Sequence, residues 1–139
     1  LELIADGHHV HPGAMRLCCC CAKDRTVLIT DAMQAAGMPD GGYTLCGESV
    51  EMQGGVVRTA SGGLAGSTLA LDAAVRNMVE HTGVAPEQAI HMASLHPARL
   101  LGMDHLLGSL APGKRANIIA LDAGLHLRQI WIQGQALSL

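Results

Sequence analysis

The segment RTVLITDAM, Arg25 to Met33, joins a continuous apolar run to a single carboxylate, Asp31. The five residues TVLIT are β-branched or aliphatic, which is typical of a strand buried on both faces of a parallel sheet. In such sheets, functional side chains gather at the carboxyl ends of the strands. The segment therefore predicts a parallel sheet. At this position Asp31 is a candidate general base, a candidate metal ligand, or an ordinary cap or turn residue.

A second apolar run, Leu1 to Ala5 (LELIA), comes earlier and ends at a turn signal, Asp6-Gly7. Pro12 is suited to the start of a helix that would continue to Ala22 before the polar Lys23-Asp24-Arg25. A strand, a helix and a strand within about 30 residues indicate a βαβ unit with a right-handed crossover. We therefore expect an α/β fold.

The middle of the chain predicts an insertion and then helices. Short alternating pieces between Tyr43 and Thr59 predict a β-hairpin after the second strand. The glycine-rich stretch ASGGLAGST, residues 60–68, is expected to open a helix that Ser67 or Thr68 caps and Gly83 ends. Its apolar face would contain Leu71, Val75, Met78 and Val79, and two shorter helices would begin near Pro86 and Pro97.

The last part of the chain predicts strands at Asn117–Leu121 and Gln129–Ile132. Two or three strands are marginally stable as a separate sheet, so these should pair or pack with strands from elsewhere. The sequence also begins at Leu1 within an apolar run, and we expect it to be part of a longer protein.

Composition excludes several functions. The 139 residues are 49% hydrophobic and 15% charged with a net charge of −3, which indicates a soluble domain without a basic nucleic-acid surface. There is neither an 18-residue apolar stretch nor a basic-then-apolar leader, so we expect no membrane association and a cytoplasmic location. Aromatic residues make up 1% of the chain, which leaves little material for stacking on bases or sugars.

Four of the five cysteines are consecutive, Cys18 to Cys21. Neighbouring residues of a helix point about 100° apart, so four adjacent thiols cannot converge on one ion. Zinc ligands are usually separated by two or more residues. We expect reduced, partly buried packing residues and a reducing compartment.

Asp6, His8, His9 and His11 follow the first predicted strand. In an extended backbone, His9 and His11 would share a face and could both bind zinc, although spacing fixes no third ligand. A surface or structural role is the alternative for each, and a small metal-binding module that also uses the cysteines remains open. Four more histidines are scattered and are expected to be structural or superficial: His91, His96, His105 and His126.

The loop SGGLAGS, Ser61 to Ser67, resembles a phosphate-binding loop because glycines expose backbone N–H groups before a helix. It lacks the G-K-[ST] ending of a P-loop, so nucleotide binding is not expected. We do expect the backbone of this loop to approach another kind of ligand closely.

Several motifs together resemble one known family. LIADGHHVHP, VLITDAMQAAG, GGLAGSTLALDAAVRNMVEHTGV, MASLHPARLLGM and LGSLAPGKRANIIALD follow the order and separations of the C-terminal part of N-acetylglucosamine-6-phosphate deacetylases, in the amidohydrolase superfamily. The resemblance spans nearly the whole chain. The cysteine block and DGHHVHP are most similar to the N-acetylgalactosamine-6-phosphate deacetylase branch.

This resemblance implies the C-terminal portion of a (β/α)₈ TIM-type barrel with a small composite β-sandwich. Residues 1–108 would supply the last two barrel strands, their helices and the hairpin insert, and residues 109–139 would supply strands of the sandwich. The missing partners of the C-terminal strands would then come from an earlier part of the enzyme.

The implied reaction is hydrolysis of an N-acetylhexosamine 6-phosphate, of the glucosamine or galactosamine type, to acetate and the amino sugar phosphate in amino sugar catabolism. The resemblance makes Asp31 the catalytic residue, which takes a proton from the metal-bound water and passes it to the leaving amine. It makes His9 the substrate histidine near the phosphate. Further substrate-binding positions implied are Asp6, Gly7, His8, Leu64, Ala65 and Gly66.

The implied cofactor is a divalent metal, with zinc expected, and its ligands, a glutamate and two histidines, would lie on strands outside this chain. The pair His9 and His11 would not be ligands, since the superfamily's metal-binding H-x-H follows the first barrel strand. A homo-oligomer acting on a small sugar phosphate is also implied. Gly63 and Asn117 depart from the threonine and aspartate usual at their positions. The alternative is a catalytically inactive fragment or interaction remnant of such an enzyme.

Overall fold

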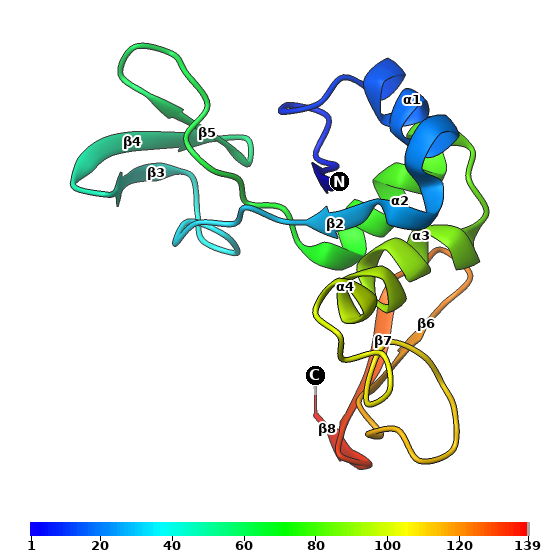
Figure 1. Cartoon of the computed structure of the whole chain (residues 1–139). Helices are drawn as coiled ribbons and strands as arrows, with labels where there is room; N and C mark the ends of the chain where they lie inside the picture. The colour runs from blue at the N-terminus through cyan, green and yellow to red at the C-terminus, as the bar shows by residue number, and fades with distance from the viewer. Residues whose placement is uncertain (139) are drawn as a thin grey trace.

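The structure is a computed structural model that describes residues 1–138, apart from the side chain of Lys23. Its elements form a mixed α/β arrangement with three separate sheets (Figure 1). In chain order they are β1 (Glu2–Ile4), α1 (Pro12–Ala22), the 3₁₀ helix η1 (Lys23–Arg25), β2 (Val27–Ile29), β3 (Gly41–Leu45), β4 (Glu48–Gln53), β5 (Val56–Thr59), α2 (Leu71–Thr82), α3 (Pro86–Ala93), α4 (Leu95–Leu100), β6 (Ile118–Leu121), β7 (Leu127–Ile132) and β8 (Gln135–Leu137).

The predicted strand–helix–strand unit is confirmed. β1 and β2 pair in parallel, with Leu3 opposite Leu28, and α1 connects them. Both leucines are buried in a core that also receives side chains from α1, α2 and α3. Three fully buried methionines, Met15, Met78 and Met92, fill this core. Their flexible side chains supply volume in a chain that has almost no aromatic residues.

The observed helix ends agree in part with those predicted from the sequence. Gly83 terminates α2 in a left-handed conformation, and Pro86 starts α3, as predicted. The predicted caps are wrong, because α2 begins at Leu71 after Ala70, with no side-chain cap. Leu71 is exposed, so the buried face of α2 is narrower than predicted.

The insertion is larger than the predicted β-hairpin. It is a three-stranded antiparallel sheet, β3-β4-β5, in which Val50 of β4 lies opposite Tyr43 on one side and Thr59 on the other. A small core of its own lies beneath it, formed by Ala35, Val50, Met52, Val57 and Ala65. Figure 1 shows this sheet extending away from the helices. The predicted hairpin is present as β3 and β4, and β5 adds a third antiparallel strand to it.

The C-terminal strands form another antiparallel sheet, β6-β7-β8 (Figure 1). The predicted strands correspond to β6 and β7, whereas the short β8 was not predicted. Apolar side chains such as Ile119, Ile132 and Leu137 are exposed on this sheet. No helix within residues 1–138 has both the length and the apolar character needed to cross a membrane.

Candidate functional site

The carboxyl ends of β1 and β2 lie at the same edge of their sheet, because the strands are parallel. Ile4 pairs with Ile29 at this edge, and Asp6 and Asp31 each follow two residues later. Adjacent strands of a sheet are about 4.8 Å apart. The fold therefore brings two of the predicted site residues, 25 positions apart in sequence, to one edge.

Asp31 has an unusual backbone conformation. Its φ is +51°, in the left-handed region that L-residues seldom occupy, although aspartate tolerates it better than most. Its side chain is exposed, and among the residues that the structure describes no donor is hydrogen-bonded to its carboxylate. The Ala32 N–H instead contacts Thr30 Oγ1 at 3.3 Å. The side chain of Asp31 thus makes none of the hydrogen bonds expected of a cap or turn residue within the described chain, and its carboxylate is available at the strand end.

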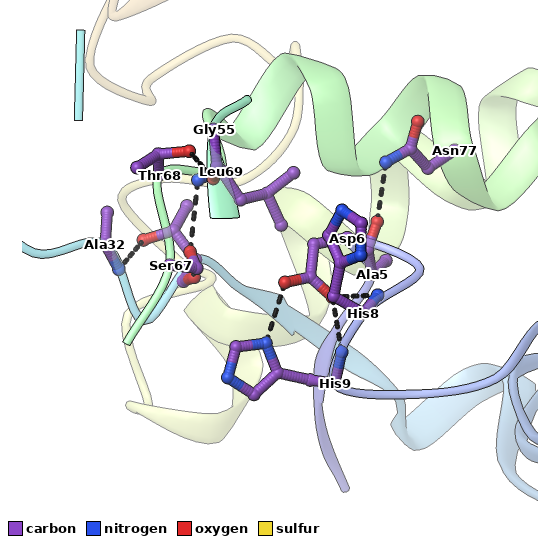
Figure 2. A network of polar contacts seen from close by, with 11 residues as sticks. Ala5, Asp6, His8, His9, Ala32, Gly55, Ser67, Thr68, Leu69 and Asn77 are labelled. Atoms are coloured by element: carbon purple, nitrogen blue, oxygen red, sulfur yellow. Dashed lines mark hydrogen bonds and ion pairs between the residues drawn. The ribbon is translucent and has the colours of Figure 1, made fainter. Parts of the chain in front are cut away.

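Ser67 joins the glycine-rich loop to this strand end. Its hydroxyl donates to the carbonyl of Thr30 and accepts the N–H of Leu69 at 3.0 Å. The backbone adds two more bonds, from Ser67 N–H to Asp31 O at 2.8 Å and from Met33 N–H to Ser67 O at 2.9 Å (Figure 2 shows the side-chain bonds). Ser67 is buried, and three of these four bonds join it to the backbone of residues 30–33, which includes Asp31. The sequence predicted Ser67 as a candidate helix cap. In the structure Ser67 instead connects the glycine-rich loop to the end of β2.

Gly66 makes the close approach between loop and strand possible. It has a φ of +70°, and a Cβ there would lie 3.3 Å from both the carbonyl oxygen of Asp31 and the side chain of Met33. A side chain at position 66 would therefore be strained and crowded. Of the three predicted substrate-binding residues of the loop, Leu64, Ala65 and Gly66, Gly66 lies closest to the backbone of Asp31.

Leu64 and Ala65 contact the insert sheet rather than Asp31. Leu64 forms an isolated bridge with Arg58, and the N–H of Ala65 donates to the carbonyl of Val57 at 3.1 Å. Ala65 is buried in the core of the insert. The segment 64–67 thus passes from the insert sheet to the end of β2, which fixes these two parts of the site relative to each other.

At the end of β1 the carboxylate of Asp6 organises the residues that follow it. Oδ1 accepts the backbone N–H groups of His8 and His9, both at 2.9 Å, and Oδ2 lies 2.7 Å from Nδ1 of His9 (Figure 2). Partial burial acts to raise the pKa of Asp6, but the hydrogen bonds from His9 and His8 outweigh it and hold that pKa below its ordinary value. Asp6 is therefore a carboxylate at neutral pH.

The remaining histidines of this stretch do not converge with His9. His8 is exposed, and His11 is exposed with its Nδ1 accepting the N–H of Gly13 at 3.1 Å. His9 Nδ1 is already engaged by Asp6. Within the described part of the chain, no three His, Cys, Asp or Glu side chains are grouped so that they could hold a metal ion. These residues therefore do not fit a metal centre, and we assign no metal-dependent step to them.

Other candidate residues have structural surroundings. His96 is buried, and its Nδ1 lies 2.8 Å from the carbonyl of Thr26, as expected for a structural histidine. Cys19 is buried with its Sγ 3.7 Å from Thr82 Oγ1, and burial raises the pKa of its thiol. Cys20 and Cys21 are exposed. All five cysteines are free thiols.

A hollow in the described surface lies elsewhere. It has a volume of about 410 Å³ and lies on the insert sheet, lined by residues such as Glu51, Arg58 and Thr59. Neither Asp31 nor His9 lines it. Within residues 1–138, β1 and β2 pair with no other strand, and at the end of β2 the glycine-rich loop forms a single parallel bridge between Ser67 and Ala32.

One supporting residue and one supporting contact were not identified from the sequence. Asn77 of α2 donates to the carbonyl of Ala5 at 2.8 Å and so ties the end of β1 to that helix (Figure 2). Asp6 was expected to line the substrate wall, but its pairing with His9 was missed. The Asp-x-x-His spacing was a usable signal, because an aspartate often accepts the N–H groups of the two or three residues that follow it. No comparable local signal pointed to Asn77.

Fold and site together define an α/β arrangement in which polar side chains lie at the carboxyl edge of parallel strands and a glycine-rich loop approaches through its backbone. The model of the family described as "Amidohydrolase family" matches residues 1–137. The chain therefore belongs to the amidohydrolase family.

Individual relatives agree with this assignment. N-acetylgalactosamine-6-phosphate deacetylase of Escherichia coli O157:H7 is 80% identical over 138 residues, which cover 99% of this chain and 37% of that protein. A protein of Escherichia coli strain K12 is also 80% identical over 138 residues, and the matched part is 83% of its length. A solved structure from Mycobacterium smegmatis, of a variant N-acetyl-D-glucosamine-6-phosphate deacetylase in complex with N-acetyl-D-glucosamine-6-phosphate, superposes with a TM-score of 0.89 at 35% identity. That match covers 97% of this chain and 36% of the other.

Proposed function

We propose that this chain is the C-terminal part of a hydrolase that removes the acetyl group from an N-acetylhexosamine 6-phosphate. The proposal rests on one structural observation and one sequence comparison. The carboxylate of Asp31, at the end of β2, accepts no hydrogen bond within the described chain. The sequence is 80% identical to a protein named for this activity. Because the chain spans little more than a third of that relative, the reaction is assigned to the complete enzyme.

The architecture proposed for the complete enzyme is a (β/α)₈ barrel with a small β-sandwich. β1 and β2 would be its last two barrel strands, and residues 109–139 would contribute to the sandwich, with residues 1–108 in the barrel. Supporting this are the parallel pairing of β1 and β2 and the apolar side chains exposed on the β6-β7-β8 sheet. Further strands on both sides of β1 and β2 would enclose the edge that carries Asp31 and His9.

In the proposed reaction, water adds to the acetamide carbonyl and the C–N bond breaks. Asp31 accepts a proton from the attacking water and delivers it to the departing amine nitrogen, which then leaves as the amino sugar phosphate. Such a carboxylate must be free of competing donors, and Asp31 meets this requirement within the described chain. His9 and the backbone at Gly66 would face the sugar phosphate, together with Asp6, Gly7, His8, Leu64 and Ala65 on the surrounding wall.

Amidohydrolases are generally metal-dependent. The residues described in this chain do not form a metal site, so we propose that the ligands of a divalent metal, zinc by expectation, lie in the part of the enzyme outside the chain. The proposed homo-oligomeric state and cytoplasmic location also refer to that complete enzyme.

A chimera tests the proposal. The matching 138 residues of the Escherichia coli O157:H7 relative would be replaced by those of the present chain, and acetate release would be measured on N-acetylgalactosamine 6-phosphate and N-acetylglucosamine 6-phosphate. We expect activity on at least one of them, and the better substrate identifies the epimer. A folded chimera inactive on both contradicts the proposal and favours the alternative, an inactive remnant.

The same assay applied to the purified chain alone examines that alternative directly. We expect no acetate release from residues 1–139 in isolation, with or without added Zn²⁺, because the described residues group no metal ligands. Metal-dependent release by the isolated chain would show that the site is complete within it.

A further inference from the structure

The carboxylate of Asp6 has more hydrogen-bond partners than it would need if its only role were to line a substrate pocket. Its side chain is 10% exposed and meets three donors, two backbone N–H groups and the ring of His9. The backbone just before it is anchored as well, because Asn77 of α2 donates to the carbonyl of the fully buried Ala5. His9 itself is partly exposed, with 21% of its side chain accessible.

The chemistry of this contact determines where the proton of His9 resides. A carboxylate has no proton to donate, so a 2.7 Å contact between Asp6 Oδ2 and His9 Nδ1 requires that Nδ1 carries the hydrogen. Two N–H donors on Oδ1 favour the ionised form of Asp6, in agreement with its lowered pKa. In the neutral imidazole only one nitrogen is protonated, which leaves Nε2 as a hydrogen-bond acceptor.

We propose that Asp6 is a positioning residue that fixes the tautomer and orientation of His9, so that Nε2 of His9 is held toward the substrate in one orientation. This inference rests on the proposed function for the identity of the substrate. The Asp6–His9 pair itself is independent of that function, since all its contacts lie within the chain.

Asp6→Asn is a nearly isosteric test. The amide oxygen can still accept the N–H groups of His8 and His9, so the turn after β1 keeps its backbone bonds. The amide NH₂ group, however, replaces the oxygen that faces Nδ1 and is a donor only. It would donate to Nδ1 and thereby move the proton of His9 to Nε2.

The direct measurement is the two-bond ¹H–¹⁵N correlation spectrum of the imidazole rings in the purified chain, at a pH where they are neutral, with His9 assigned by the loss of its signals in His9→Gln. We expect the Nδ1–H tautomer in the unchanged chain and the Nε2–H tautomer in Asp6→Asn. Asp72→Asn is the matched control, because Asp72 is also an ion-paired carboxylate with a lowered pKa but contacts Arg76. An Nε2–H tautomer in the unchanged chain overturns the proposal, even if Asp6→Asn fails to fold.

The kinetic consequence is tested in the chimera described above. Partners that orient a histidine typically change activity by about 10- to 100-fold, so we expect Asp6→Asn to lower kcat/KM by that factor. In a His9→Gln background the same change should add less than about a twofold loss. Equal losses in both backgrounds would mean that Asp6 acts through the fold alone, which contradicts the proposal. An inactive parent chimera would refute the proposed function, whereas the tautomer measurement would still decide the role of Asp6.

Discussion

Ser67→Ala should weaken the hydrogen-bonded connection between the glycine-rich loop and the end of β2. The change removes one hydroxyl that donates to the carbonyl of Thr30 and accepts the N–H of Leu69. Ser67 and Leu69 are both buried, so water cannot readily replace the lost partner of the Leu69 N–H. The carbonyl of Thr30 is half-buried and regains part of its solvation.

The magnitude follows from these two groups. A buried polar group left without a partner costs about 1–3 kcal/mol, and a partly hydrated one costs less. We expect the free energy of unfolding to fall by about 2 kcal/mol. With a urea dependence of about 2 kcal/mol per molar for a small domain, the midpoint should move by about 1 M.

The assay is urea unfolding of the purified chain followed by far-UV circular dichroism. This signal reports the helices next to the connection between the glycine-rich loop and β2, whereas fluorescence from Trp131 reports β7 in the C-terminal sheet. Thr68→Ala is the matched control, because its hydroxyl makes one solvent-accessible bond to the carbonyl of Gly55 at 2.6 Å, and its loss should cost about 0.5 kcal/mol. Equal shifts for the two variants would refute the role given to Ser67.

Three further predictions concern the backbone, pH and thiols. Gly66→Ala should destabilise the chain more than Gly37→Ala, because both have a positive φ but only Gly66 has close neighbours, and urea midpoints of the two variants check this. The pKa of Asp122 is lowered from 3.8 to about 2, chiefly by the backbone N–H of His126, so its contribution to stability is present above pH 3.8 and is lost as the pH falls through 2. Asp122→Asn should therefore have a flatter stability profile in that interval in acid titration, and an unchanged profile would contradict this. Buried Cys19, whose thiol pKa is raised, should react with a thiol reagent much more slowly than exposed Cys20, as measured by mass spectrometry of labelled peptides, and equal rates would contradict its burial.

The sequence was sufficient where local chemistry determines the structure. The apolar run at residues 26–30, the proline at Pro12 and the glycine at Gly83 each specify backbone geometry by themselves, and the predicted strand and helices appear near those positions. The insert was underestimated because the predicted region, residues 43–59, was assigned as a hairpin and forms three strands, β3, β4 and β5. The strand β8 was missed because three exposed residues form it.

The sequence predicted which residues lie at the strand ends of the site, but not the contacts that hold them there. Position at a strand end made Asp31 and Asp6 candidates, but the left-handed backbone of Asp31 depends on contacts with Ser67, 36 residues away. The bond from Asn77 to Ala5 spans 72 residues. Such long-range contacts depend on how the loop before α2, and α2 itself, approach the ends of β2 and β1, which no local spacing determines.

The role of Asp31 as the proton carrier is the central claim, and Asp31→Asn in the chimera tests it most directly. The variant keeps the size of the side chain and removes its basicity, so kcat should fall by about 10²- to 10⁴-fold, while the circular dichroism spectrum stays unchanged. Asp24→Asn, at an exposed aspartate in η1, serves as the control and should leave kcat within about twofold. A folded Asp31→Asn enzyme whose kcat equals that of the control would contradict the account.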